Sequence, residues 1–302
     1  MDGKMFEKWF AGIGYEVAFW KNVYRWRHTR EGMFRWSHYS SVINLECFDA
    51  NAFLNTIPDK NGHPLVLDVG CGLSYATGNL IERDNQDKTE INLHYIDPLA
   101  QPFNNILKRG KLSLPPIEFG MVEYLSGFYP NHDVDLVIIQ NALDHSSNPV
   151  KGIYEAIDVL RHGGILYLNH HPDEAVTEHY KGFHQWNIND DDGQLIIWNK
   201  HEKHYINKLI GSFTDIEVKR HESGHVIAVI KKRNDVPQHL LDEKADKSLL
   251  CQQLMDTALQ VSNPWTAIRL KVSYWRYNAI QFLAQAMPWK VKMALKKIIK
   301  QA

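Results

Sequence analysis

The segment from Val66 to Gly72 constrains the fold of this chain more than any other. It reads Val-Leu-Asp-Val-Gly-Cys-Gly, so an apolar stretch meets an acidic residue and then two glycines one residue apart. The apolar stretch predicts a buried strand. Because glycine lacks the Cβ that keeps ligands away from the backbone, the turn after this strand is expected to approach a ligand closely. The segment therefore predicts a cofactor site at the end of a buried strand.

Two phosphate-binding motifs also contain closely spaced glycines, and neither fits. A dinucleotide fingerprint needs a third glycine where this chain has Tyr75. A P-loop needs a lysine and a glycine spacing that Gly72 and Gly78 do not offer. A plain strand-to-helix turn stays an alternative, since an isolated Gly-x-Gly is a weak signal. The downstream segments decide between these interpretations.

Three later segments extend the pattern. Leu93–Asp97 is a second strand that ends in an acidic residue, 25 positions after Gly72, where a carboxylate can accept both hydroxyls of a ribose. Asp135–Gln140 predicts a further strand, and polar residues follow it at Asn141–His145. Residues 160–168 predict a helix end, a double-glycine turn and another strand. Alternating strands and helices of this kind indicate a mostly parallel sheet.

This order of motifs resembles the class I S-adenosylmethionine-dependent methyltransferases, over roughly residues 60 to 232. The resemblance implies an α/β fold with a Rossmann-like seven-stranded sheet, mostly parallel, whose last strand is antiparallel. It implies S-adenosyl-L-methionine as the cofactor and S-adenosyl-L-homocysteine as the product. The residues it assigns to the cofactor are Asp68, Gly70, Cys71 and Gly72 beside the methionine part, Asp97 and Pro98 at the ribose, and Asn141 near the sulfonium.

One segment departs from the family's pattern. After the third strand the family often has Gly-Asp-Ala-Glu, in which the aspartate binds the adenine amine, whereas this chain has Gly120-Met121-Val122-Glu123. We expect Met121 and Val122 to enclose the adenine ring, and Glu123 or the backbone to supply the polar contacts.

Composition and pattern divide the chain into three regions. Residues 1–59 are rich in aromatic side chains and predict a helical cap, which in the resembled family commonly covers the cofactor. Residues 60–232 form the cofactor-binding domain and end in a helix over 201–210 and two strands joined by a short turn, hence antiparallel. Residues 233–302 are a polar linker and a helical extension.

A long polar insert at 170–199 lies within the central region. Loops at the carboxyl ends of strands line the ligand crevice of a doubly wound sheet, so the insert is expected to bind the methyl acceptor. Aromatic and hydrogen-bonding groups together suit a hydroxylated acceptor such as a sugar. The stretch from His184 to Asn187 is similar to one in methyltransferases encoded with bacterial surface-polysaccharide genes. The predicted acceptor-binding residues are His170, His171, Tyr180, Gln185, Trp186 and Asn187. Alternatively, His184 and Trp186 only fix the insert to the core.

Methyl transfer to a hydroxyl requires the acceptor oxygen to lose its proton, and histidine is the commonest side chain for that task. We expect His184 to be this base, with His145 as the second candidate. No metal site is predicted, because the three cysteines, at 47, 71 and 251, are scattered singly with no Cys-x-x-Cys pair.

The end of the chain is strongly basic. Residues 257–302 contain eight lysines and arginines and no acidic residue. An apolar stripe from Trp265 to Ala286 recurs at steps of three and four residues. Such a helix is typical of attachment to anionic lipid, and packing on the enzyme or on a second subunit is the alternative. The negative charge of the rest of the chain argues against nucleic acid as a partner.

The remaining features of the sequence favour a cytoplasmic enzyme. The chain has no run of 18 apolar residues and no secretory signal at its start. The predicted function is O-methylation of a sugar or glycan hydroxyl in cell-surface polysaccharide biosynthesis, in the cytoplasm or peripherally at the inner membrane face. The alternatives are methylation of a small phosphorylated or lipid-linked metabolite, and a protein that binds the cofactor without chemistry.

Overall fold

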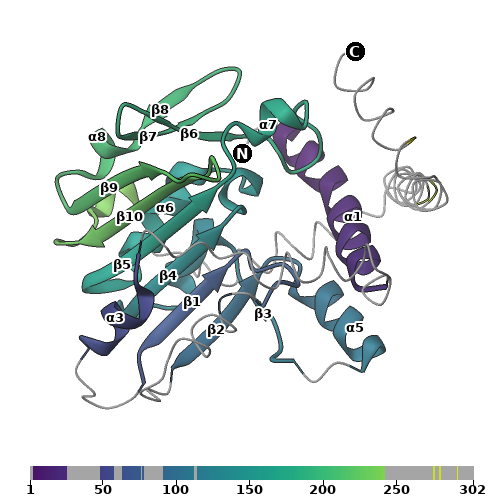
Figure 1. Cartoon of the computed structure of the whole chain (residues 1–302), viewed down its shortest axis with the longest axis horizontal. Helices are drawn as coiled ribbons and strands as arrows, with labels where there is room; N and C mark the ends of the chain where they lie inside the picture. The colour runs from purple at the N-terminus through teal and green to yellow at the C-terminus, as the bar shows by residue number, and fades with distance from the viewer. Residues whose placement is uncertain are drawn as a thin grey trace.

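The computed structural model describes residues 3–25, 48–57, 63–75, 77, 91–111 and 114–241, with the isolated residues 275, 279 and 291. Ten strands lie in these ranges, and helices flank them (Figure 1). The strands are β1 Leu65–Val69, β2 Asn92–Asp97, β3 Glu118–Phe119, β4 Val134–Gln140, β5 Leu160–His170, β6 Asn187–Asp191, β7 Gln194–Trp198, β8 Lys203–Tyr205, β9 Thr214–Arg220 and β10 Val226–Lys232. The α-helices are α1 Gly3–Arg25, α3 Ala50–Asn55, α5 Ala100–Gly110, α6 Pro149–Asp158, α7 Glu174–Thr177 and α8 Ile206–Ile210. Short 3-10 turns cover Val122–Gly127, Leu143–His145 and Gln238–Leu240.

Seven strands form the central sheet in the order β3-β2-β1-β4-β5-β10-β9. The pairs from β3 to β5 are parallel, and β10 runs antiparallel to both β5 and β9. This is the predicted Rossmann-like sheet with an antiparallel last strand, which the structure confirms.

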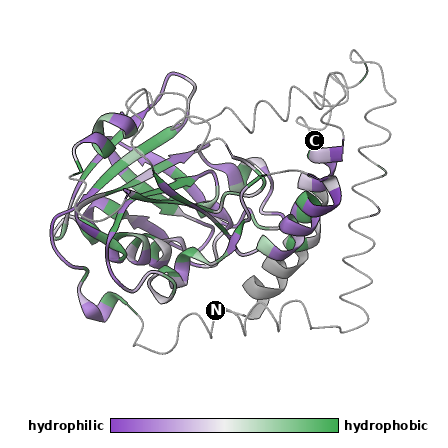
Figure 2. Ribbon diagram, turned by 90° about the horizontal axis from the view of Figure 1, so that it is seen from below, coloured by the Kyte–Doolittle hydropathy of each residue, from purple (hydrophilic) through white to green (hydrophobic). Residues whose placement is uncertain are grey.

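The middle strands are buried on both faces. In β4, the residues from Leu136 to Ile139 are at most 1% exposed, and the strands of the sheet carry mostly apolar residues (Figure 2). Continuous apolar runs of this kind suit a parallel sheet covered by helices on both sides. Helix α6 covers one face, and its start is fixed by the side chain of Asn148, which accepts a hydrogen bond from the Lys151 amide, and by Pro149 in the first turn.

The strand order reverses between β1 and β4, which lie side by side although β2 and β3 come between them in the chain. Ligands of open α/β sheets bind outside the carboxyl ends of the strands at such a switch point. The turn at Gly70–Gly72 follows β1, and Asn141–His145 follows β4. The two polar segments identified in the sequence therefore meet at one crevice.

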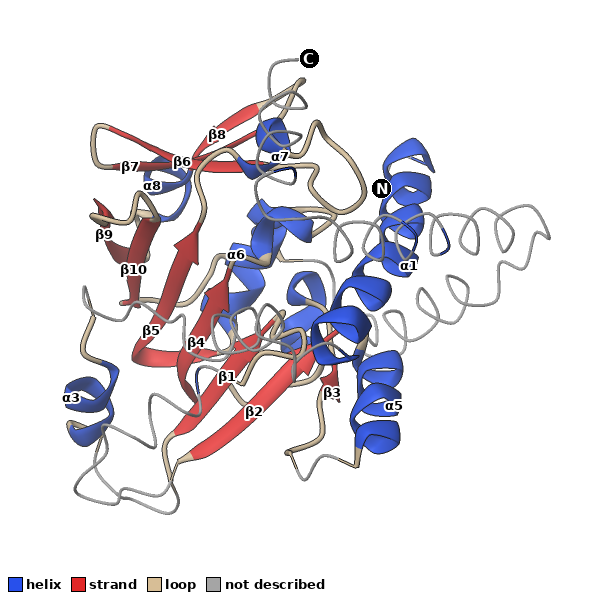
Figure 3. Cartoon of the chain, turned by 45° about the vertical axis from the view of Figure 1, so that its right-hand side comes forward, coloured by secondary structure: helices blue, strands red, loops and turns tan. Residues whose placement is uncertain are grey.

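Helix α1 lies across the carboxyl ends of β1 and β2 and beside α5 (Figures 1 and 3). The Tyr24 hydroxyl donates a hydrogen bond to the Gly110 carbonyl over 3.0 Å, and the Trp20 ring packs edge-on against Phe103. These contacts fix α1 over the cofactor side of the crevice. Within the region predicted as a helical cap, Gly3–Arg25 is helical, whereas residues 26–47 lie outside the described ranges.

Two local predictions were wrong. Residues 160–162, predicted as a helix end, begin β5, because α6 ends at Asp158 and Leu160 pairs with Val134 of β4. Residues 203–205, predicted as helix, form β8 and pair with β7, so α8 begins only at Ile206. In both places strand pairing, with β4 in the first case and with the preceding strand β7 in the second, overrides the local helical pattern.

The insert contains the short helix α7 and the strands β6 and β7, which form with the following strand β8 a second, three-stranded sheet in the order β6-β7-β8. It lies beyond β9 and β10 at one end of the molecule (Figure 3). The predicted strand at 194–198 corresponds to β7, Gln194–Trp198.

Candidate functional site

The turn after β1 has the shape that the two glycines predict. Gly70 and Gly72 both have positive φ, +74° and +58°, a region that disfavours residues with a Cβ. A Cβ at Gly70 would lie 2.4 Å from the Ala142 Cβ, and one at Gly72 would lie 2.5 Å from the Trp20 ring. The amides of Gly70 and Cys71 donate to the Ile96 carbonyl, so the turn is held against the end of β2.

Asp97 lies at the end of β2 and is 6% exposed. Its two carboxylate oxygens accept hydrogen bonds from the Gly72 amide at 3.0 Å and the Leu99 amide at 2.7 Å. Each oxygen keeps a second acceptor position, as two ribose hydroxyls require. Burial raises the pKa of Asp97 to about 7, opposed by these two hydrogen bonds, and the charge of Glu16 raises it further.

Asp68, inside β1, is also buried and accepts a hydrogen bond from the Thr77 hydroxyl at 2.7 Å. Burial raises the pKa of Asp68 to about 7, the Thr77 hydrogen bond lowers it, and the nearby charge of Asp97 raises it. Two carboxylates with little water around them favour a ligand that carries positive charge, such as a sulfonium or an ammonium group.

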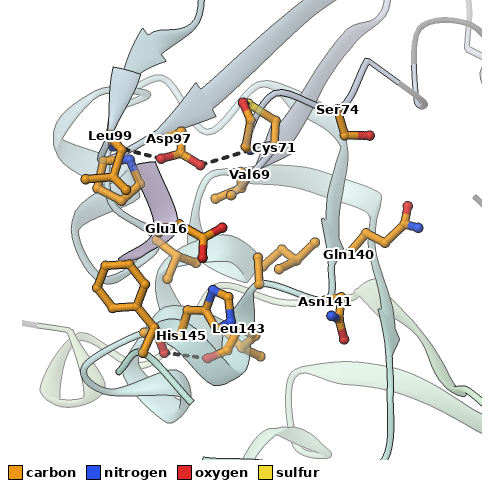
Figure 4. A pocket seen from close by; sticks show the side chains of 18 of the residues that line it. Glu16, Val69, Cys71, Ser74, Asp97, Leu99, Gln140, Asn141, Leu143 and His145 are labelled. Carbon is orange, nitrogen blue, oxygen red and sulfur yellow. Dashed lines mark hydrogen bonds between the residues drawn. The ribbon is translucent and has the colours of Figure 1, made fainter. Parts of the chain in front are cut away.

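One cavity of about 360 Å³ joins these groups to the ends of β4 and β5, within the range of roughly 300–1,000 Å³ that small-molecule sites occupy. The carboxylates of Glu16 from α1 and Asp97 from β2 both point into it (Figure 4). The glycine turn, the unfilled acceptor positions of Asp97 and the acidic lining together fit S-adenosylmethionine. All the cofactor residues predicted from the sequence line this cavity, namely Asp68, Gly70, Cys71, Gly72, Asp97, Pro98, Met121, Val122, Glu123 and Asn141.

Glu123 also binds the loop that precedes α6. One oxygen of its buried carboxylate accepts hydrogen bonds from the amide and hydroxyl of Ser147, both at 2.6 Å, and from the Asn148 amide at 3.3 Å. Glu123 therefore positions the loop before α6. Met121, 4% exposed, and Val122 line the cavity as the predicted adenine wall requires.

At the other end of the cavity three side chains meet. The Asp144 Oδ2 atom lies 2.9 Å from His184 Nδ1 and 3.4 Å from His145 Nε2, and the two ring nitrogens are 3.1 Å apart. Asp144 and His145 lie in the 3-10 turn after β4, whereas His184 lies in the insert after β5. We call these three residues the Asp-His-His cluster.

Burial lowers the pKa of His184, but the hydrogen bond to Asp144 and the charges of Asp144 and Glu174 raise it more strongly, to about 9. Burial by itself raises the pKa of Asp144, yet the neighbouring histidines bring it below its usual value. The carboxyl of Asp144 is therefore ionised, and the ring of His184 holds a proton at neutral pH. The sequence-based prediction assumed a histidine with its ordinary pKa, whereas the pKa of His184 is raised.

The two other histidines predicted at the acceptor differ in position. His171 lines the cavity, with its ring 4.0 Å from that of His225. His170 is 1% exposed and does not line the cavity, and neither of its ring nitrogens has a hydrogen-bond partner among the described residues. Burial lowers the pKa of His170 to about 4, so its ring is neutral.

The remaining predicted acceptor residues do not reach the cavity. Gln185 donates to the carbonyls of Tyr180 and Gly182. Trp186 is 3% exposed and belongs to the main hydrophobic core. Asn187 accepts from the Val176 amide and donates to the Tyr180 hydroxyl, both at 3.0 Å. These contacts hold the insert together, which is the alternative that the sequence left open for Trp186.

Sequence reasoning missed several residues that line the cavity. They come from the helical cap, the insert and the turn before β10, where no motif marks them: Glu16, Phe19, Trp20, Glu174, Glu178, Phe183 and His225. For Glu16 and Trp20 the sequence does carry an indication, because residues four apart lie on the same face of a helix. The Trp20 ring nitrogen donates to the Glu16 carboxylate over 2.8 Å.

A family model described as "Methyltransferase domain" matches residues 67–168. The chain therefore contains an S-adenosylmethionine-dependent methyltransferase domain, and S-adenosylmethionine is its cofactor. No curated protein is similar enough in sequence to the chain to count as a match.

Several solved structures are similar to part of this chain at low identity. The CMeT domain of the citrinin polyketide synthase is 15% identical with a TM-score of 0.47, over 69% of this chain and 58% of that one. A T. thermophilus 16S rRNA N2 G1207 methyltransferase, in complex with AdoMet and guanosine, is 14% identical with a TM-score of 0.35, over 62% of this chain and 39% of that one. A putative methyltransferase from Listeria monocytogenes is 13% identical with a TM-score of 0.38, over 61% of this chain and 97% of that one. Their acceptors give no information on the acceptor of this chain.

Proposed function

We propose that this protein transfers the methyl group of S-adenosylmethionine to a hydroxyl of a sugar or glycan. The observation that carries the proposal is the single cavity that joins the Gly70–Gly72 turn and Asp97 at one end to the Asp-His-His cluster at the other. A bound acceptor oxygen near the cluster would face the cofactor side of the same cavity. Bringing the two reactants together in this way supplies a large part of the rate of a displacement reaction.

The cofactor side holds its ligand through carboxylates and backbone. In this proposal Asp97 accepts the ribose hydroxyls, Met121 and Val122 flank the adenine, and Asp68 and Glu16 offset the positive charge. When bound, S-adenosylmethionine supplies the methyl group already activated as a sulfonium.

The proton of the attacking hydroxyl is removed, in this proposal, at the Asp-His-His cluster. His184 is the first candidate and His145 the second, and Asp144 orients His184 through the bond to Nδ1. The other ring nitrogen of His184 has no hydrogen-bond partner among the described residues. Because the ring holds its own proton at neutral pH, it can act on another proton only after the first has left or been displaced.

The charge of the lining favours a neutral acceptor. Among the described residues, the cavity is lined by carboxylates and by no lysine or arginine: Glu16, Asp68, Asp97, Glu123, Glu174 and Glu178. A phosphate group in this surrounding would meet repulsion from these carboxylates, which the charge of the protonated His184 offsets only in part. Sugar hydroxyls, in contrast, find hydrogen-bond acceptors on Glu174 and Glu178 and an apolar wall on Phe183. This argues against the phosphorylated metabolite considered as an alternative.

An acceptor screen tests the proposed function. The purified protein is incubated with S-adenosylmethionine and with neutral glycans, and the release of S-adenosylhomocysteine is measured beside the same sugars in phosphorylated form. We expect turnover with a neutral hydroxylated acceptor and little or none with its phosphate ester. Preference for the phosphate ester, or cofactor binding with no turnover on any hydroxyl compound, would contradict the proposal.

We further propose that the enzyme serves cell-surface polysaccharide synthesis at the inner membrane face. Among the described helices none has the length and apolar character needed to span a bilayer. Most of the basic extension lies outside the described residues, but Trp275, on its apolar stripe, is 74% exposed. An exposed tryptophan in a segment whose sequence is rich in lysine and arginine supports attachment to an anionic lipid surface.

Deletion of residues 257–302 tests this location. The shortened protein is expected to bind S-adenosylmethionine normally but to lose sedimentation with anionic liposomes, and high salt should release the full chain, since each basic residue contributes about 1 kcal/mol at such a surface. If the full chain ignores anionic vesicles at low salt, the membrane location is wrong.

A further inference from the structure

We propose that Asp144, His145 and His184 bind a divalent transition-metal ion such as Zn²⁺ at the acceptor end of the cavity. The binding of the ion does not depend on the proposed function. Only its role in activating a hydroxyl rests on that proposal.

The three donor atoms have the spacing of ligands on one metal ion. Asp144 Oδ2, His145 Nε2 and His184 Nδ1 are separated by 2.9, 3.1 and 3.4 Å. Ligand bonds of about 2.0–2.2 Å to nitrogen and oxygen place neighbouring ligands roughly 3.0–3.4 Å apart in tetrahedral or octahedral geometry. Among the described residues, this is the one group of histidine, cysteine and acidic side chains whose donor atoms converge in this way.

The convergence is difficult to explain by hydrogen bonds alone. Each ring nitrogen carries at most one proton, so His184 Nδ1 cannot donate fully to Asp144 and also to His145. A single cation at the centre of the triangle accepts a lone pair from all three atoms at once. Two imidazoles and one carboxylate are the donor set of many sites for Zn²⁺ and Fe²⁺ rather than for Mg²⁺ or Ca²⁺, which prefer oxygen ligands.

The charge around the cluster supports a cation independently. Asp144 is 2% exposed, and its second oxygen, Oδ1, is buried without a hydrogen-bond partner among the described residues. Its ion-pair partners among them are the two histidines of the cluster. Glu174, whose Oε2 atom is likewise buried and unpartnered, adds negative charge from the insert. A buried carboxylate is costly unless it is paired or coordinates a metal.

The position gives the ion a role in catalysis. His145 and His184 line the cavity, whereas Asp144 lies behind them, so the side of the triangle that faces the cavity is open to a further ligand. Three protein ligands with an open position are typical of catalytic rather than structural metal sites. An acceptor hydroxyl bound there would lose its proton more readily, because a divalent cation stabilises the oxygen anion that attacks. The ion would also take the place of the proton on His184 Nδ1.

Binding of Co²⁺ tests the proposal without any acceptor. The full-length protein, freed of metal with a chelator, is titrated with Co²⁺, and the visible absorption of the bound ion and the metal content after dialysis are measured. We expect one ion per chain. Asp144→Asn and His145→Gln are each expected to weaken Co²⁺ binding by about a hundredfold or more, since each removes a ligand.

His171→Gln is the matched control, because His171 lines the same cavity but lies outside the cluster. It should keep one Co²⁺ per chain. Calorimetric binding of S-adenosylmethionine shows that each variant is folded. The proposal is overturned if the folded wild-type protein binds no Co²⁺, or if the Asp144→Asn and His145→Gln variants bind it as the wild type does. Either result leaves the methyltransferase function standing, because that function is judged by release of S-adenosylhomocysteine.

Discussion

The two ends of the cavity are built in different ways. At the cofactor end, the two oxygens of Asp97 accept hydrogen bonds from backbone amides. One oxygen of Asp68 accepts a hydrogen bond from the Thr77 hydroxyl. At the acceptor end, Asp144, His170 and Glu174 keep buried polar atoms without partners among the described residues. In the first arrangement each carboxylate already has a hydrogen-bond donor, and Asp97 keeps acceptor positions for a ligand. In the second arrangement buried polar atoms lack hydrogen-bond partners among the described residues, and the pKa values of several groups are shifted, which is typical of a site that performs chemistry.

The largest expected effect separates the two ends most clearly. His184→Ala should lower turnover by about 10²–10⁴, the contribution of a positioned group to proton removal. It should leave the affinity for S-adenosylmethionine nearly unchanged, because His184 lies at the acceptor end. Steady-state kinetics with a true acceptor and calorimetry with the cofactor measure both. Full turnover in this variant would move the role to His145, and a parallel loss of cofactor affinity would contradict the division of the cavity.

The opposite end is tested by Asp97→Ala. Loss of the carboxylate that we propose accepts hydrogen bonds from the ribose hydroxyls should weaken S-adenosylmethionine binding by about 10- to 100-fold, since hydrogen bonds to a charged group contribute roughly 1.5–3 kcal/mol. At saturating cofactor, turnover should recover to a large extent. Wild-type affinity in a folded Asp97→Ala protein would show that the ribose is bound elsewhere.

The next prediction concerns the insert and asks whether Asn187 supports the structure of the insert or contacts the acceptor. Asn187 is fully buried and bonded to Val176, Tyr180 and Trp198. Asn187→Ala should therefore lower stability by about 1–3 kcal/mol, seen as a lower midpoint of thermal unfolding, while cofactor affinity stays the same. An unchanged unfolding midpoint with a raised KM for the acceptor would instead favour the direct contact that the sequence predicted.

The smallest expected effect is the pH dependence of cofactor binding. Because burial raises the pKa of Asp97 to about 7, its carboxyl is mostly protonated at pH 6 and mostly ionised at pH 8. In the proposed function the ionised form accepts hydrogen bonds from the ribose hydroxyls, so the affinity for S-adenosylmethionine should rise with pH through 7, by up to about tenfold between pH 6 and pH 8. Calorimetry at several pH values measures this rise.

Asp97→Asn is the control for this pH effect. Its affinity should be lower and should depend less on pH, with the remaining dependence due to Asp68, whose pKa is raised in the same way. A flat affinity of the wild type between pH 6 and pH 8 would contradict the raised pKa of Asp97.

The difference between the two ends of the cavity also explains how much of the structure could be predicted from the sequence. The strand from Leu65 to Val69, its glycine turn and the acidic residue Asp97 are local patterns, and the structure has them where the sequence predicts them. The start of β5 at Leu160 and the strand β8 were mispredicted, because pairing with β4 and β7 outweighed the local preference. At the acceptor end, Gln185, Trp186 and Asn187 were chosen for their chemistry, yet their burial gives them a packing role in the insert.

The sequence by itself determined the sheet and the position of the glycine turn, because continuous apolar stretches and the conformational freedom of glycine act over a few neighbouring residues. Only the tertiary structure decided that Asp144 and His145 meet His184, about 40 positions away, and that Glu16 reaches the cavity from α1. Contacts of this kind depend on how distant segments pack, and on the low polarity of the buried space between them. That packing, and not any spacing along the chain, creates the Asp-His-His cluster.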